Sequence, residues 1–180
     1  MFYIIVGGIT GIAFILLIFA IYYNKFQFVI VKIEEAENNI DIYLKKKLDL
    51  IKRISPVIRK KLKDKKLLEE VDNNYDSLNS FELNDKLSSL NEKVFNILDD
   101  NEKLLKSEKI VNLINDLNNN DENLTASIKF YNNTIVDFNR LILSFPSNFI
   151  RLFFGYKKKE FYSNEKREVY EILKEEKKEK

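Results

Sequence analysis

The N-terminal 23 residues are almost continuously apolar. Residues 2–23 read FYIIVGGITGIAFILLIFAIYY and contain no charged side chain. A helix needs about 20 such residues to cross the hydrocarbon core of a bilayer. Tyr3 stands at one end of this stretch and Tyr22 with Tyr23 at the other, where aromatic side chains favour the two membrane interfaces. The pattern predicts a transmembrane helix over residues 3–22 that contacts the lipid bilayer.

A cleaved signal peptide is the main alternative for this stretch. It would have a basic start, a shorter apolar core and a cleavage site of small residues, and residues 1–23 have none of these. We therefore expect a retained anchor over 1–23. Basic residues follow the span at Lys25, Lys32 and 45–47 but do not precede it. The positive-inside rule then predicts a single-pass protein of the cell membrane, with its N-terminus outside and the remainder in the cytoplasm.

After the anchor, apolar residues recur at steps of three and four, the period of an amphipathic helix. These positions are Val29, Ile33, Ala36, Ile40, Leu44, Leu48, Ile51, Ile54, Ile58 and Leu62. They predict one long helix from Lys25 to about Lys66 that continues directly out of the membrane. Pro56 lies within it, so we expect a kink near Ile54 or, alternatively, a helix end there.

The rest of the chain predicts shorter helices between turn-rich segments. Residues 71–80 are rich in turn formers, and a second helix follows from about Phe81. Residues 99–107 form a connection in which Ser107 is a candidate N-cap, and a third helix runs towards Leu143, weakened at 118–123. Pro146 begins a short apolar helix that Gly155 ends.

These elements predict an all-α fold in which the transmembrane helix continues into an antiparallel bundle of three or four long helices. We expect an anchor over 1–23 and a bundle domain over 24–155. Residues 156–180 alternate Lys and Glu with few apolar positions. This composition is typical of a poorly ordered tail or a detached, solvated helix.

Composition narrows the chemistry available to the chain. It has no Cys and no His, which excludes thiolate and imidazole chemistry and the usual zinc ligands. Gly155 is the only glycine beyond the anchor, so no glycine-rich phosphate loop is present. We therefore expect no enzymatic activity, no catalytic or metal-binding residues, no cofactor and no small-molecule substrate.

Charge is unevenly distributed, although the formal net charge is only +2. Residues 45–66 carry eleven basic side chains and two acids, whereas residues 67–124 carry five basic side chains and fourteen acids. We expect the basic helix to lie against acidic neighbours in the bundle. A surface for nucleic acid or anionic lipid is the alternative, but it requires unpaired positive charge, and we expect no nucleic-acid partner.

Polar residues interrupt the predicted apolar stripes. Asn132 and Asn139 are seven residues apart on the third helix, and Asp41 and Asp49 are eight apart beside the stripe of the first. Buried polar groups must be paired, so we expect bonds from these asparagines to these aspartates that fix the register between the two helices. A ligand or partner site is the alternative.

Two segments resemble the LemA family of bacterial membrane proteins. NNIDIYLKKKLDLI at 38–51 is similar to a stretch on the family's first soluble helix. YNNTIVDFNRLILSFPSNFIRLFFGYKKKEFY at 131–162 resembles its two Y-N pairs, F-P-x-N and F-G-F. Lys52, Phe138 and Tyr156 depart from the family's pattern. The resemblance implies a membrane-anchored four-helix bundle of unestablished role, and it adds these candidate interaction residues: Tyr131, Phe145, Pro146, Asn148 and Gly155.

Two functions are compatible with these predictions. The first is a non-enzymatic scaffold whose cytoplasmic bundle binds protein partners or a second copy of the chain. The second is a lipid-facing or membrane-shaping module in which residues 146–159 lie on the bilayer. In that arrangement Phe149, Leu152 and Phe153 insert, and Lys157–Lys159 meet the headgroups.

Overall fold

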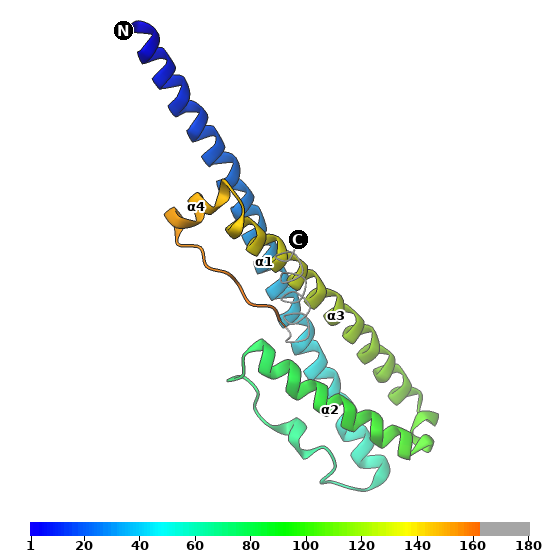
Figure 1. The fold of residues 1–180 in the computed structure, drawn as a ribbon. Helices are drawn as coiled ribbons and strands as arrows, with labels where there is room; N and C mark the ends of the chain where they lie inside the picture. Colours follow the sequence, from blue (N-terminus) through cyan, green and yellow to red (C-terminus); the bar gives the residue numbers. More distant parts are fainter. Residues whose placement is uncertain (163–180) are drawn as a thin grey trace, which may run out of the picture. The chain divides into compact units, whose positions relative to one another are not determined.

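The computed structural model describes residues 1–162, which form four α-helices and no strand (Figure 1). The α-helices are α1 (Phe2–Leu62), α2 (Ser80–Asp100), α3 (Glu108–Leu143) and α4 (Ser147–Phe154). Two short 3-10 helices, η1 (Glu69–Asp72) and η2 (Glu102–Lys106), lie in the connections. The predicted all-α fold is confirmed.

The contacts divide the chain into two compact units. Unit 1 comprises Met1–Ala36 and the chain from Lys129 onward, and unit 2 comprises Glu37–Ile128. The helices α1 and α3 each contribute residues to both units.

Unit 2 is a three-helix bundle made of the second half of α1, all of α2 and the first half of α3. Its buried core is aliphatic on all three helices and includes Leu44, Ile51 and Ile58 from α1, Leu87, Leu90 and Val94 from α2, and Ile110, Leu113 and Leu117 from α3. Pro56 does not end α1, which continues to Leu62. The alternative prediction of a helix end is therefore wrong.

The connection from α1 to α2 is an ordered loop held by Arg59 in the last turn of α1. Its guanidinium donates to the carbonyls of Leu67 and Leu68, both at 2.6 Å, and to Asp72 at 2.7 Å. Val71 is fully buried within this loop. A segment whose composition predicts a turn is thus fixed to the bundle by one side chain.

A capping box marks the start of α2, and backbone hydrogen bonds mark the start of α3. The Asn79 side chain accepts from the Glu82 amide at 2.9 Å, and the Asn79 amide donates to the Glu82 carboxylate at 3.2 Å, which forms a capping box. The Ser107 carbonyl accepts from the amides of Ile110 and Val111, so α3 begins at the predicted place. Residues 118–123 remain helical.

Unit 1 packs the first part of α1 against the second part of α3 and against α4. Its core cluster mixes rings and aliphatic side chains: Phe26, Ile33, Ile135, Phe138, Ile142 and Ile150. The helix α4 ends at Gly155, whose φ of 67° lies in the left-handed region where glycine is unstrained. The amide of Tyr156 then donates to the Arg151 carbonyl at 3.1 Å.

Candidate functional site

The N-terminal half of α1 is solvent-exposed along residues 1–17, and it is long and apolar enough to cross a membrane. The inner end of this stretch is different, because Phe19 and Tyr22 are partly buried against the core of unit 1. The last turns of the predicted span therefore belong to the packed part of unit 1.

The short helix α4 lies against these last turns of the apolar stretch. The Phe19 ring centroid is 5.9 Å from that of Phe153 in an edge-on arrangement, and Tyr23 is 5.1 Å from Phe154. Ile150 is buried on the inner side of α4. The outer side is apolar and exposed: Phe149 is 58% exposed and Phe153 is 80% exposed. An aromatic face is thus open beside the end of the predicted span.

The F-P-S-N segment forms the start of α4. Pro146 is its N-cap, and the amide of Asn148 donates to the Ser144 carbonyl at 2.8 Å. Phe145 is exposed, and its ring centroid lies 6.1 Å from that of Phe149. Ser147, which the sequence did not single out, is fully buried, and its Oγ lies 2.6 Å from the Leu141 carbonyl and 2.9 Å from that of Ser144. A small hydroxyl directly after the proline is the signal that could have identified it.

Beyond Gly155 the chain runs back along α3, where two asparagines hold it. The Asn139 side chain donates to the Lys159 carbonyl at 2.9 Å and accepts from the Lys159 amide at 3.0 Å. Asn132 accepts from the Tyr162 amide at 2.8 Å. Both asparagines are at least 95% buried. Residues 156–162 are therefore not a detached tail, and the rest of the predicted tail, 163–180, lies outside the described residues.

The predicted bonds from Asn132 and Asn139 to Asp41 and Asp49 were wrong. Both aspartates belong to unit 2 and are exposed: Asp41 accepts a hydrogen bond from the Ser80 hydroxyl, and Asp49 lies 3.7 Å from Arg53 on its own helix. The asparagines bond instead to backbone atoms of residues 159 and 162, 20 and 30 positions away in sequence.

A buried polar cluster that the sequence did not reveal joins the helices of unit 2. The Lys47 ammonium, on a side chain only 5% exposed, lies 2.8 Å from the Asp121 carboxylate, which also accepts from Asn91 at 3.1 Å. The neighbouring Asn120 donates to the Tyr43 carbonyl at 3.0 Å. Lys47 is three residues after Leu44 and four before Ile51, so its helical phase was the available signal.

Charge in unit 2 is compensated in part. Of the eleven basic residues at 45–66, Lys47 and Arg59 form ion pairs with acids of the 67–124 segment. Glu70 lies 3.0 Å from Lys86 and 2.5 Å from Lys93. The hydrogen bonds from Lys93 and Lys86, with the charges of these two ammonium groups, lower the pKa of Glu70 from 4.5 to about 2.

Two surface grooves lie in unit 2, and both have charged and aliphatic linings. One is bounded by Lys61, Leu62 and residues 99–104, and the other by residues 66–70 with Leu90, Lys93, Asn96 and Ile97. Neither is lined by Ser, Thr or Tyr, so they offer no hydroxyl nucleophile. Among residues 1–162, no group of three acidic side chains is placed to hold a metal ion.

These features define a class of all-α proteins in which one helix supplies both an apolar stretch long enough to span a membrane and part of a folded core. Within that class, the chain belongs to the LemA family, whose family model matches residues 36–173. The match includes both asparagines, the F-P-S-N segment and Gly155. A search of curated proteins finds no match.

Proposed function

We propose that this LemA-family protein is a non-enzymatic membrane protein that anchors a helical bundle and offers it to protein partners. The observation that supports the proposal most strongly is the course of α1. This single uninterrupted helix supplies the apolar stretch over 3–22 and then the core positions Ile40–Ile58 of unit 2. The apolar stretch and these core positions are therefore parts of the same helix.

The exposed side of α1 in unit 2 is the surface we propose for partners. Lys45, Lys46, Lys52 and Lys60 are exposed there, and Ile42 is 58% exposed beside them. Exposed Lys and Arg attract partners of opposite charge and speed their association. We propose a protein partner with an acidic surface that surrounds an apolar contact.

Crosslinking of the full-length protein in its own membrane tests this surface. We expect discrete protein adducts with the wild type and their loss in the Lys52→Glu/Lys60→Glu variant, whose changes are exposed. Glu34→Lys/Glu35→Lys, also exposed on α1 but in unit 1, is the matched control and should retain the adducts. Absence of any protein adduct in every growth state would refute the proposal.

The proposed orientation places the N-terminus outside the cell membrane and unit 2 in the cytoplasm. Since the chain has no Cys, single cysteines give a direct test with a membrane-impermeant maleimide. We expect Tyr3→Cys to be labelled on intact cells and Ser77→Cys, which is exposed in unit 2, only after permeabilisation. The reverse labelling pattern would show that the N-terminus lies inside and unit 2 outside.

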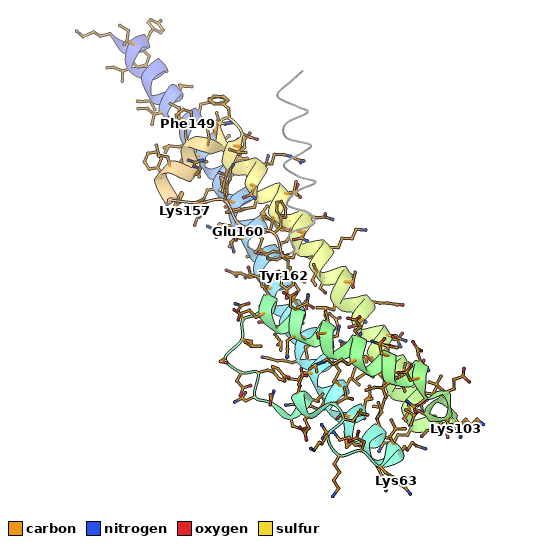
Figure 2. The ribbon with its side chains drawn as sticks, turned by 60° about the horizontal axis from the view of Figure 1, so that its bottom comes forward. Lys63, Lys103, Phe149, Lys157, Glu160 and Tyr162 are labelled. Carbon is orange, nitrogen blue, oxygen red and sulfur yellow. The ribbon has the colours of Figure 1, made fainter. Side chains whose placement is uncertain are left out.

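A second function, contact of α4 with lipid, is supported by the exposed aromatic face beside the end of the predicted span. Lys157 and Lys158 follow this face and are exposed. Figure 2 shows Phe149 nearest the N-terminal end of α1, with Lys157, Glu160 and Tyr162 progressively farther from it. An apolar face followed by basic residues is the pattern of helices that lie in a membrane interface.

Tryptophan fluorescence can test lipid contact, because the chain contains no Trp. In vesicles that contain brominated lipids, we expect strong quenching of Phe153→Trp. Phe81→Trp, at a position 42% exposed in unit 2, is the control and should be quenched little. Equal quenching at the two positions would contradict a lipid-facing role for α4.

A further inference from the structure

The two asparagines on α3 act on a polypeptide backbone rather than on side chains. Asn139 bonds to both the amide and the carbonyl of Lys159, and Asn132 bonds to the amide of Tyr162. The Tyr131 hydroxyl adds a longer contact of 3.4 Å to the Glu160 carbonyl. These bonds recognise an extended chain and its direction, and they do not depend on which residues the chain carries.

The spacing and the direction of the bonds together favour one extended backbone conformation. Asn132 and Asn139 are seven residues apart on a helix, a rise of about 10 Å. Their partners are three residues apart, which spans about 9 Å in a polyproline II helix, where every third residue faces the same way. A flat β-strand would turn every third residue to the opposite side. The face of α3 therefore matches a polyproline-II-type segment that runs antiparallel to it.

The chain's own segment does not use the whole site. Asn132 is only 1% exposed, and its Nδ2 is buried without a hydrogen-bond acceptor among residues 1–162. A buried donor left unpaired costs about 1–3 kcal/mol. Asn139, by contrast, uses both its donor and its acceptor. A segment that placed a carbonyl opposite the Asn132 amide would complete the second pair of bonds.

We propose that the Asn132–Asn139 face of α3 is a binding site for an extended polypeptide of polyproline II geometry, which residues 157–162 occupy as an intramolecular pseudo-ligand. The partner's segment would carry an aromatic residue that packs edge-on against Tyr131, as Tyr162 does at 6.1 Å. This inference rests on the proposed role in protein interaction and adds a second surface with a defined class of partner.

A synthetic peptide of residues 156–162, YKKKEFY, is the probe for this site in the full-length protein. Lys159→Pro and Tyr162→Pro remove the two backbone N–H groups that donate to the asparagines. Together, the two changes should release residues 157–162 from the site. An intramolecular segment competes at an effective concentration of about millimolar. We therefore expect the labelled peptide to bind the double variant at least about tenfold more tightly than the wild type. Lys158→Pro, whose amide makes none of these bonds, is the matched control and should resemble the wild type.

Asparagine substitution decides whether the binding is the one proposed. In the Lys159→Pro/Tyr162→Pro background, Asn139→Leu should abolish binding of the peptide. Persistent binding would show that charge or aromatic contact alone attracts it, and this result would overturn the inference, as would no binding to the double variant up to millimolar peptide.

A measurement on the unmodified chain keeps the test valid if the double variant does not fold. Millimolar peptide should accelerate amide hydrogen exchange at Lys159 and Tyr162, and unchanged exchange there would overturn the inference. Failure of this site leaves the adducts that depend on Lys52 and Lys60 in place. Absence of any protein adduct with the wild type refutes the proposed function and leaves peptide binding unaffected, so the two failures are distinguishable.

Discussion

Units 1 and 2 both use α1 and α3, but their cores have different chemistry. The core of unit 1 contains Phe26 and Phe138, with Tyr22, Tyr131 and Tyr156 packed around it. In unit 2 the buried apolar side chains are aliphatic apart from Tyr75. Aromatic rings have polar edges and are common at membrane interfaces, whereas aliphatic side chains carry no polar group. One pair of helices thus changes its packing along its length.

The two units also differ in the charge of their polar side chains. Unit 2 uses ion pairs between side chains, such as Lys47 with Asp121 and Arg59 with Asp72. Among the described residues of unit 1, the buried polar side chains are neutral, and two of them are the asparagines that bond to backbone atoms. Neutral amides avoid much of the desolvation penalty that a buried charge carries. The charged side chain that the described part of the chain buries, Lys47, therefore lies in unit 2.

The largest expected effects come from cavities placed in one core at a time. Phe26→Ala should lower the free energy of unfolding of unit 1 by about 4 kcal/mol, and Leu90→Ala that of unit 2 by about 3 kcal/mol. Both residues are fully buried. Amide hydrogen exchange should increase mainly in the unit that carries the change. Equal acceleration in both units after Leu90→Ala would show that they unfold as one.

Breaking the buried ion pair of unit 2 should have the next largest effect. Asp121→Leu leaves the Lys47 ammonium buried without its partner, and we expect a loss of about 2 kcal/mol, because the 28% exposure of Asp121 admits some water. Replacing both residues, Lys47→Met with Asp121→Leu, should restore most of the stability in urea unfolding. If the double variant were less stable than Asp121→Leu alone, the pair would not be the source of the loss.

The sequence predicted best the features that depend on neighbours along the chain. Leu143 as the end of the third helix, Pro146 and Gly155 around the fourth, and the helix start after Ser107 were all correct. Proline and glycine act within one helical turn, and a serine is a residue type that favours a helix start. The recurrence of apolar residues at steps of three and four likewise predicted the all-α fold.

The sequence did not predict the features that depend on where distant segments lie. The asparagine pair interrupts the apolar stripe of the third helix, but its partners do not follow from the sequence, because residues 157–162 carry few apolar positions. Lys47 lies in a run of three lysines whose other members are exposed, so composition alone does not mark it as buried. A segment that is bound through its backbone amides needs no particular side chains, so the amino-acid sequence does not reveal it.

Helix capping gives a smaller contrast between the units. Asn79→Ala should cost unit 2 about 1 kcal/mol, because it removes the capping box at the start of α2. The short helix α4 of unit 1 has no side-chain cap, and Asn148→Ala near its start should change stability by less than about 0.5 kcal/mol. Urea unfolding of both variants measures the difference. Comparable losses would mean that the capping box contributes nothing specific.

The smallest expected effect is a pH dependence confined to unit 2, where Glu70 accepts from Lys86 and Lys93. Its folded pKa of about 2 lies below its ordinary value of 4.5, so the unfolded chain binds this proton more readily as the pH falls. The stabilisation is therefore fully present above about pH 5 and is lost as the pH approaches 2. Glu70→Gln should be slightly less stable than the wild type at pH 7 and equal to it near pH 2. Glu69→Gln, which changes an exposed neighbour, should follow the wild type throughout. A Glu70→Gln deficit that did not shrink on acidification would place the origin of the effect elsewhere than in the carboxylate's charge.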